Sequence, residues 1–198
     1  MAKMTLFLVR HPRPSVAPGL CYGATDVAVA REEVGSVVNQ LAALLPAGVP
    51  VYSSPLQRCK ALASPLAAKL GAGAPLIDPR LKEMDFGNWE MRAWENIERA
   101  EVDGWAADLT GYRPGGGESV LTVARRVAGF LDGLLQSEGR AAILVCHAGT
   151  IRLLRAWRCG DGLRDIARRA ASTAHEIGYG QMLVLDCEKP ATSPFLAS

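Results

Sequence analysis

Cysteine is scarce in this chain of 198 residues, and its five copies are scattered. They are Cys21, Cys59, Cys146, Cys159 and Cys187. Their number is odd and no two of them form a C-x-x-C pair, so the sequence indicates neither a disulfide framework nor a zinc site. Clusters of carboxylates of the type that binds Mg²⁺ or Ca²⁺ are also missing. We therefore expect a protein that uses no metal ion and no cofactor.

A strong charge of one sign and long apolar runs are missing as well. Lys and Arg number 22 and Asp and Glu 20, and the resulting net charge of +2 is too small to indicate a nucleic-acid or membrane surface. The first apolar run stops at Arg10, which is too short for a signal-peptide core, and no later run approaches a membrane span. The sequence therefore predicts a soluble, cytoplasmic protein with no nucleic-acid and no membrane partner.

Lysine is rare, because 17 of the 22 basic residues are arginine. Arginine is suited to bidentate contacts with phosphate and carboxylate, so the composition favours a small anionic ligand. Six arginines lie between residues 152 and 169, but this segment matches no recognisable nucleic-acid-binding module. We therefore expect these arginines to form a solvated helical face. This group comprises Arg152, Arg155, Arg158, Arg164, Arg168 and Arg169.

The order of the apolar segments predicts an α/β fold. Continuous apolar runs at 6–9 and 141–146 are typical of strands covered on both faces, and runs with helical spacing follow them. Because strands alternate with helices and no repeat or linker divides the chain, we expect one domain, 1–198, built as a three-layer αβα sandwich around a mainly parallel sheet. Further strands are expected at 49–52, 76–77 and 181–186, and helices near 31–45, 54–70, 120–134 and 148–157.

Two segments lie outside this regular pattern. Residues 89–117 are interpreted as a lid, and 190–198 as a frayed tail. The glycine run at 115–117 lacks the lysine and the spacing of nucleotide-binding loops, so the start of a helix is favoured over a phosphate cradle. The tryptophans of the lid segment are expected to fill the core rather than to bind a ligand. They are Trp89, Trp94 and Trp105.

Basic side chains follow three of the predicted strands. Arg10 and His11 come directly after the first strand, and His147 comes directly after the strand at 141–146. Arg58 lies in the first turn of the helix that follows the strand at 49–52. Because the carboxyl ends of parallel strands form the ligand crevice of an open α/β sheet, we expect these side chains to lie together.

An acidic loop supplies the remaining chemistry. It contains Glu83 and Asp85, either of which is a candidate proton donor, and Glu83 also fits a solvated acid paired with Lys82 or Arg80. A neutral imidazole can attack phosphorus, fixed cations stabilise the phosphoryl oxygens, and a carboxylic acid protonates the leaving oxygen. The set of residues therefore favours phosphoryl transfer through a histidine nucleophile.

Five short motifs occur in order along the chain. A strand followed by Arg-His lies at 8–11, S-x-L-x-R at 54–58 and L-x-E-x-D-F-G-x-W-E at 81–90. G-G-E-S lies at 116–119, and a strand that ends in H-A-G at 145–149. In these motifs, and over nearly its whole length, the sequence resembles the histidine phosphatase superfamily, which includes phosphoglycerate mutases, fructose bisphosphatases and α-ribazole phosphatases.

The resemblance implies a phosphoglycerate mutase-like fold and a metal-independent phosphomonoesterase that forms a phosphohistidine. It implies that His11 is the nucleophile and that Glu83, by its place in the motif, is the general acid. The phosphate-binding residues that it implies are Arg10, Arg58, His147, Thr25 and Ala148. The expected partner is a small phosphomonoester, and the resemblance is compatible with a homodimer.

The chain departs from the family pattern near the first histidine. Pro12 replaces the usual glycine, which removes a backbone donor and favours an extended conformation at His11. Val16 and Ala17 stand where many members carry a phosphate-contacting asparagine, and Leu62 stands where threonine is common. The third histidine, His175, lies in no motif and is expected to be structural or exposed.

The aromatic residues near the motifs are most similar to those of α-ribazole phosphatases, which remove a 5′-phosphate during cobalamin assembly. Tyr22, Phe86 and the tryptophans at 89–105 would then stack on a flat benzimidazole. The alternatives are a broad-specificity phosphatase of sugar phosphates or phosphoserine, a phosphoglycerate mutase, and an inactive phosphate-binding relative. The short segment between Glu83 and His147 favours a phosphatase over a mutase.

Overall fold

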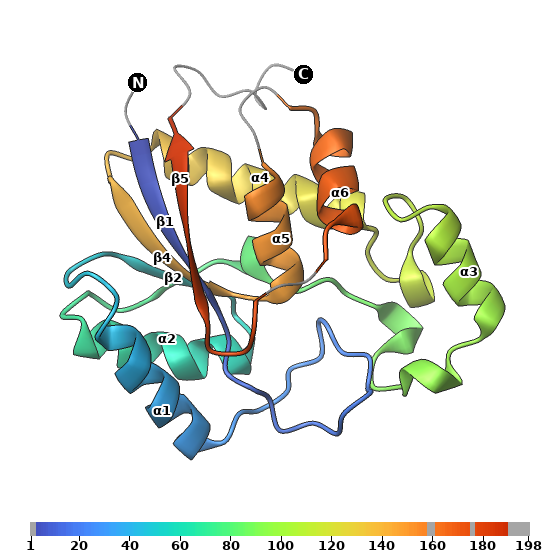
Figure 1. Cartoon of the computed structure of the whole chain (residues 1–198), viewed down its shortest axis with the longest axis horizontal. Helices are drawn as coiled ribbons and strands as arrows, with labels where there is room; N and C mark the ends of the chain where they lie inside the picture. Colours follow the sequence, from blue (N-terminus) through green and yellow to red (C-terminus); the bar gives the residue numbers. More distant parts are fainter. Residues whose placement is uncertain (1–2, 158–160, 175–176, 190–198) are drawn as a thin grey trace.

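A computed structural model describes residues 3–157, 161–174 and 177–189 of the chain. Within these residues one five-stranded sheet has the order β3-β2-β4-β1-β5 (Figure 1). Its strands are β1 (Lys3–Arg10), β2 (Val51–Ser53), β3 (Leu76–Ile77), β4 (Ala141–Cys146) and β5 (Met182–Glu188). All neighbouring pairs are parallel except β1 and β5, which are antiparallel. The expected mainly parallel sheet is therefore confirmed.

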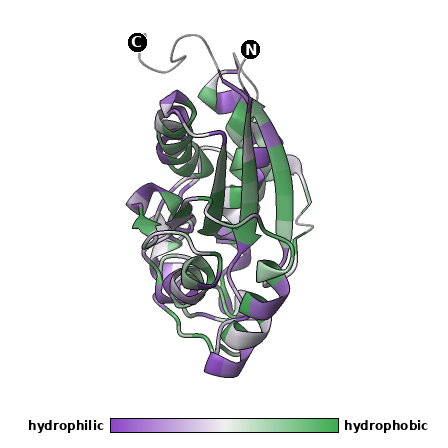
Figure 2. Cartoon of the chain, turned by 90° about the vertical axis from the view of Figure 1, so that its left-hand side faces the viewer, coloured by the Kyte–Doolittle hydropathy of each residue, from purple (hydrophilic) through white to green (hydrophobic). Residues whose placement is uncertain are grey.

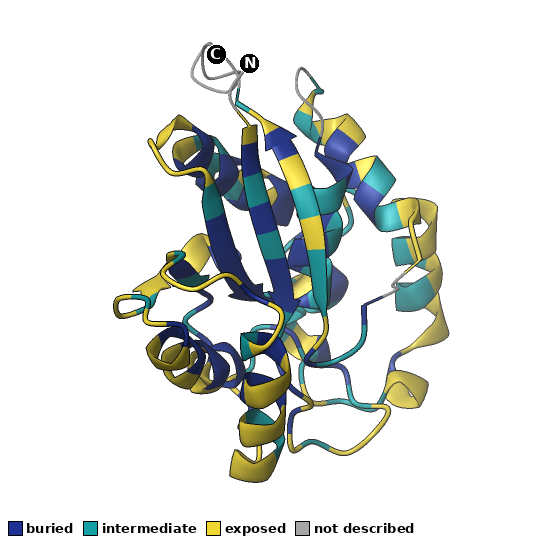
Figure 3. Cartoon of the chain, turned by 60° about the vertical axis from the view of Figure 1, so that its left-hand side comes forward, coloured by how far each residue is buried: buried dark blue, intermediate teal, exposed yellow. Residues whose placement is uncertain are grey.

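Helices cover both faces of the sheet and make the three expected layers (Figure 1). One face is covered by α1 (Arg31–Ala42) and α2 (Gln57–Lys69), and the other by α4 (Val120–Gln136), α5 (Ala148–Ala156) and α6 (Leu163–Ser172). The central strands are buried along most of their length, whereas β5 at the edge has exposed residues such as Val184 (Figure 3). The central strands β1 and β4 are mostly apolar, as expected of strands that are covered on both faces (Figure 2).

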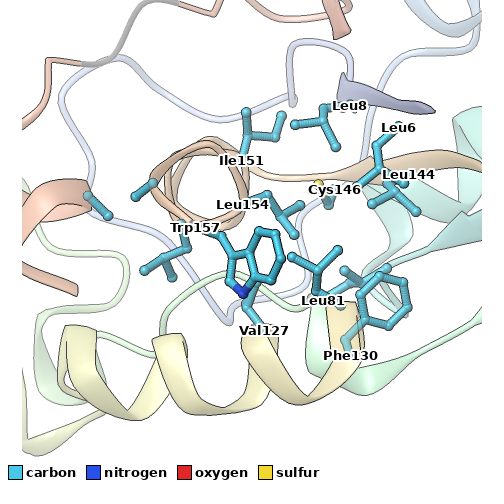
Figure 4. Packing of buried hydrophobic residues seen from close by; sticks show 14 of the residues in the cluster. Leu6, Leu8, Leu81, Val127, Phe130, Leu144, Cys146, Ile151, Leu154 and Trp157 are labelled. Atoms are coloured by element: carbon cyan, nitrogen blue, oxygen red, sulfur yellow. The ribbon is translucent and has the colours of Figure 1, made fainter. Parts of the chain in front are cut away.

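The alternation of side chains along β1 divides the core into two clusters. Leu6 and Leu8 belong to the cluster under α4, α5 and α6, whereas Val9 belongs to the cluster under α1 and α2. Figure 4 shows the first cluster, in which residues of α5 and α4 such as Leu154 and Phe130 meet residues of the strands. Burial of this apolar area holds α5 against the sheet and thereby holds the start of α5 at the end of β4.

One local expectation needs correction. The helix after β2 was expected to begin near Ser54 with Pro55 in its first turn, but α2 begins at Gln57 with Leu56 as its N-cap. The Ser54 hydroxyl accepts from the Leu56 amide at 3.3 Å, so 54–56 forms a turn of its own before the helix. In the segment interpreted as a lid, α-helix is confined to α3 (Arg99–Ala107), and short 3₁₀ turns form at Gly87–Trp89, Trp94–Asn96 and Pro114–Gly116.

The segment 87–117, called the cap segment below, lies beyond the end of the sheet together with the loop 11–30 (Figure 1). The two are joined by backbone hydrogen bonds from Cys21 to Arg92 at 2.8 Å and from Met91 to Cys21 at 2.7 Å. The glycine run 115–117 leads into α4, and the adjacent Glu118 amide donates to the Asp85 carbonyl at 2.8 Å. The cap segment is therefore tied to the loop 11–30 and to the acidic loop.

In the part of the chain that the structure describes, no helix is long and apolar enough to cross a membrane. The segment 190–198, Cys159, Arg158 and His175 lie outside the described residues.

Candidate active site

The side chains that were expected at the strand ends do lie together. β1 and β4 are neighbours whose register pairs Arg10 with Cys146, so His11 and His147 follow paired residues. Their ring centroids are 5.1 Å apart. Arg58, the second residue of α2, joins them because its Nε donates to Nδ1 of His147 at 3.2 Å. The geometry of a parallel sheet thus brings the two histidines and Arg58 to the same edge.

His11 is held as a neutral imidazole. It is only 3% exposed, and its Nδ1 lies 2.7 Å from the Pro12 carbonyl oxygen. A carbonyl oxygen can only accept, so Nδ1 carries the proton and Nε2 keeps its electron pair. Burial, and then the charge of Arg58, lowers the pKa of His11 to about 3. The backbone carbonyl of Pro12 thus sets the tautomer of His11.

His147 has the opposite tautomer. Because its Nδ1 accepts from Arg58, its Nε2 carries the proton and donates to the Ser54 hydroxyl at 2.8 Å. Burial and the charge of Arg58 lower the pKa of His147 well below its usual range, so this ring is neutral too. Both ring nitrogens have protein partners, so a phosphate oxygen can bind this ring only by replacing one of them. Ser54 had no assigned role in the sequence, although it opens the S-x-L-x-R motif.

Arg58 is buried and is held by the loop 22–26. Its Nη1 donates to the Thr25 carbonyl at 2.8 Å and its Nη2 donates to the Gly23 carbonyl. A Cβ at Gly23 would lie 1.9 Å from the Met84 carbonyl oxygen, so only glycine fits where this loop touches the acidic loop. The guanidinium is therefore fixed between the loop and His147.

Thr25 faces away from the histidines. Its hydroxyl and its amide both donate to the Glu90 carboxylate, at 2.5 and 3.1 Å. The same carboxylate accepts from the amides of Gly23, Ala24 and Phe86 at 2.9 to 3.1 Å. These hydrogen bonds lower the pKa of Glu90 against the effect of burial. Glu90 therefore organises the loop that holds Arg58, a role that its place in the W-E motif did not reveal.

The carboxylates of Glu83 and Asp85 accept hydrogen bonds from different parts of the chain. The Glu83 carboxylate accepts from the Gly149 amide in the first turn of α5 at 3.0 Å and from the Met84 amide at 3.0 Å. A Cβ at Gly149 would lie 2.4 Å from Glu83 Oε1, so a larger residue there would displace this carboxylate. Asp85 instead accepts from the Gly87 amide at 2.8 Å within its own loop. Of the two acids only Glu83 reaches the start of α5, where Ala148 is the first helical residue.

A pocket of about 610 Å³ opens beside this group and extends under the cap segment. Its wall is mostly apolar, and five aromatic side chains line it: Tyr22, Phe86, Trp94, Trp105 and Tyr179. Trp94 is 42% exposed and stacks on Trp105 with ring centroids 6.4 Å apart. Trp89 is fully buried and donates to Glu101 at 2.7 Å. The expectation that the tryptophans fill the core is therefore confirmed for Trp89, whereas Trp105 is partly buried against the same cluster and Trp94 is exposed.

Tyr179 covers the basic end of the pocket. Its ring lies 3.8 Å from the Arg10 guanidinium carbon and 5.5 Å from the centre of the His11 ring. Its hydroxyl lies 2.7 Å from that of Tyr22. Arg10 also donates to the Ile177 carbonyl at 2.8 Å, so the segment before β5 is held against the end of β1. Nothing in the sequence pattern distinguished Tyr179.

Among the described residues, no three His, Cys, Asp or Glu side chains are grouped so that they could hold a metal ion. Cys21, Cys59 and Cys146 are buried thiols, and Cys59 lies 3.5 Å from Nε2 of His147.

Known proteins resemble this chain over most of its length. The family model described as histidine phosphatase superfamily (branch 1) matches residues 6–181. The adenosylcobalamin/alpha-ribazole phosphatase of Salmonella typhimurium (strain LT2) is 30% identical over 98% of this chain and 96% of its own length. The crystal structure of phosphoglycerate mutase from Thermus thermophilus matches with a TM-score of 0.69 and 28% identity, over 92% of both chains. The expected phosphoglycerate mutase-like fold is therefore confirmed.

Other relatives match over shorter stretches. The metal-independent phosphoserine phosphatase of Arabidopsis thaliana is 30% identical over 54% of this chain and 47% of its own length. A protein of Hydrogenobacter thermophilus is 28% identical, and the match spans 59% of this chain and 58% of that protein.

Proposed function

The chain belongs to branch 1 of the histidine phosphatase superfamily, and on this basis we propose that it hydrolyses a small phosphomonoester through a phosphohistidine on His11. The observation that supports this most directly is the hydrogen bond between Nδ1 of His11 and the Pro12 carbonyl. It leaves Nε2 unprotonated in a buried site beside the guanidinium of Arg58. A neutral nucleophile next to fixed cations suits attack on a phosphate dianion.

The proposed reaction has two steps. Nε2 of His11 attacks phosphorus, the N–P bond forms as the bond from phosphorus to the leaving oxygen breaks, and Glu83 gives its proton to that oxygen. Water then attacks the phosphohistidine and gives a proton to the Glu83 carboxylate. The N–P bond breaks, which releases inorganic phosphate and restores His11. Glu83 is assigned this role because its carboxylate lies at the start of α5 and lines the pocket.

The phosphate-binding roles follow from the same contacts. Arg10 and Arg58 are proposed to stabilise the phosphoryl oxygens, and the Ala148 amide lies in the first turn of α5, where amides have no partner within the helix. We propose that a phosphate oxygen replaces Ser54 as the acceptor from Nε2 of His147. Thr25 is assigned to holding Arg58 through its carbonyl, because its hydroxyl is bound to Glu90.

For the substrate we propose α-ribazole 5′-phosphate, which joins a phosphate to a ribose and a flat benzimidazole. Two observations support this choice: the aromatic wall of the pocket, and the 30% identity over the full length to a relative named for this activity. Stacking on such a wall contributes on the order of 1 kcal/mol per contact. The second candidate is a broader phosphatase that also accepts phosphoserine, because a shorter match is to a phosphoserine phosphatase.

The nucleophile is tested by quenching the reaction of ³²P-labelled substrate with alkali, which preserves phosphohistidine. Wild type should retain label, whereas His11→Ala should retain none and should show no turnover, because the covalent pathway has been deleted. Arg168→Met, at an exposed arginine of α6, serves as the control. Turnover by His11→Ala would refute the mechanism.

Two further measurements test the rest of the proposal. A chelator should leave hydrolysis of p-nitrophenyl phosphate unchanged, and a loss that Mg²⁺ restores would contradict a metal-independent mechanism. Values of kcat/KM should be compared for α-ribazole 5′-phosphate, phosphoserine, phosphoglycerates and sugar phosphates. Equal values would reject α-ribazole 5′-phosphate as the specific substrate, but the assignment as a phosphatase would stand. If phosphoglycerates are interconverted faster than phosphate is released, the enzyme is a mutase.

A further inference from the structure

Arg152 was expected on a solvated helical face, but it lines the pocket. It lies on α5 three residues after Gly149, whose amide holds Glu83, and both residues contribute to the pocket wall. Residues three apart in a helix lie on the same face and are separated by about 4.5 Å along its axis. The Arg152 side chain therefore lies about one helical turn beyond the proposed proton donor, on the side into which a leaving group would extend.

The Arg152 guanidinium is poorly satisfied within the protein. Nη2 donates to the Ala171 carbonyl at 3.0 Å, and this is its only hydrogen bond to the described part of the chain. Nε is buried and has no acceptor among the described residues. A guanidinium offers five N–H donors, so most of them are unused. An unsatisfied donor in a half-buried cation is costly, which indicates that a partner is missing.

The charge of Arg152 is also not paired. Among the described residues no carboxylate lies within ion-pair distance of Arg152, and Glu83 acts on it only at longer range. Burial accordingly lowers the pKa of this guanidinium. By contrast, Arg168 and Arg169 on the neighbouring helix α6 pair with Asp165 and Asp161 at 3.3 and 2.7 Å. An unpaired cation in an apolar wall is therefore specific to the position that faces the pocket.

The opposite wall shows the same pattern. α3 turns Val102, Trp105 and Ala106 into the pocket, at the spacing of one helix face, and Leu109 follows just after the helix. The indole N–H of Trp105 is buried there and has no acceptor in the described part of the chain. Two residues that line this pocket, Arg152 and Trp105, thus each carry a buried donor without an acceptor among the described residues.

We propose that Arg152 is a specificity-determining residue that binds an oxygen acceptor, a sugar hydroxyl or a carboxylate, on the leaving-group part of the substrate. The inference rests on the proposed function, because it takes the phosphate to lie at the Arg10 and His11 end of the pocket. The arrangement requires a substrate with two recognition points, a phosphate and an oxygen acceptor about one helical turn beyond the leaving oxygen. Simple alkyl or aryl phosphates supply only the first. A small rotation of the side chain brings its covered donors to the ligand.

The test uses substrates that differ in this acceptor. We expect Arg152→Met, which keeps the length and removes the donors, to lower kcat/KM by about 10-fold or more for an acceptor-bearing substrate. For phenyl phosphate, which has no second acceptor, the change should stay below about threefold. If kcat/KM falls only for α-ribazole 5′-phosphate, the acceptor that Arg152 binds is a hydroxyl group. If it falls only for 4-carboxyphenyl phosphate, the acceptor is a carboxylate. Either result supports the proposal. Equal losses on all substrates, or none on any, would overturn it.

Two controls separate this role from the alternatives. If Arg152 only joined α5 to α6 through Ala171, Arg152→Met would lower the melting temperature and slow every substrate alike, whereas Arg168→Met should change neither property. Calorimetry in the His11→Ala background measures binding without turnover, so the inference is tested even if the phosphatase mechanism fails. There, Arg152→Met should weaken binding of 4-carboxyphenyl phosphate or α-ribazole 5′-phosphate, but not of phenyl phosphate. An equal change in affinity for all three ligands, or no change for any of them, would reject the proposal.

Discussion

Arg58 and His147 are joined directly, side chain to side chain, with Nε of the arginine donating to Nδ1 of the histidine at 3.2 Å. This one contact fixes the proton of His147 on Nε2, while the Pro12 carbonyl fixes the proton of His11 on Nδ1. The two imidazoles are therefore neutral but not equivalent. Nε2 of His11 keeps a free electron pair, whereas Nε2 of His147 carries a proton that it can donate.

The first prediction concerns this contact. Arg58→Lys keeps a charge but cannot reach His147, Thr25 and Gly23 at once, so kcat/KM for p-nitrophenyl phosphate should fall by about 100-fold or more. ¹⁵N NMR of the wild type should show His147 protonated on Nε2 and His11 on Nδ1 at pH 7. In the variant the His147 tautomer should no longer be fixed. Near-normal activity of Arg58→Lys, with Arg168→Lys as the control, would contradict this account.

The second prediction concerns stability and pH. The pKa of His11 is lowered to about 3 and that of His147 is lowered well below its usual range. The unfolded chain binds more protons than the folded one below about pH 6.5, so the free energy of unfolding should fall as the pH falls from about 6.5 towards 5. The slope is about 1 kcal/mol per pH unit for each histidine.

Denaturant titrations at several pH values measure this slope. A variant with both His11 and His147 replaced by asparagine should show a flatter profile over the same range, because neither position can then take up a proton. An unchanged slope would show that the two rings are not held neutral by the fold.

The third prediction separates Glu83 from Asp85. A leaving group of low pKa needs little protonation, so Glu83→Gln should slow an alkyl phosphate far more than p-nitrophenyl phosphate, by about 10-fold or more in the ratio of the two kcat/KM values. Asp85→Asn is the matched control, since Asp85 is bound to the Gly87 amide in its own loop. If Asp85→Asn shows the leaving-group dependence instead, the proton donor must be reassigned.

The fourth prediction concerns Glu90. Its carboxylate accepts from three consecutive amides of the loop that holds Arg58, and an amide side chain would turn an NH₂ group towards some of these donors. Glu90→Gln should therefore destabilise the fold by about 1–3 kcal/mol and lower kcat/KM. Glu98→Gln at the edge of the cap segment is the control. Unchanged unfolding and activity of Glu90→Gln would show that the loop does not depend on this carboxylate.

The residues at the strand ends could be predicted from the sequence because their position follows from the sheet alone. Apolar runs define the parallel strands, and whatever follows each strand must lie at the same edge. Tyr179 and Arg152 could not be predicted in this way, since their positions depend on how a loop folds back and on how α5 and α3 enclose a pocket. The direction of the Thr25 hydroxyl depends on Glu90, 65 residues away in the chain. Such contacts leave no periodic pattern.

The position of β1 in the middle of the sheet also has a consequence for folding. β1 is synthesised first, yet both of its neighbours come late, since Thr5 pairs with Ala141 and Lys3 pairs with Glu188. Contacts between such distant parts of a chain form slowly, because a long loop must close before they can stabilise anything. During translation β1 therefore stays without its partners until residues 141–188 have left the ribosome. Only then can the two histidines meet.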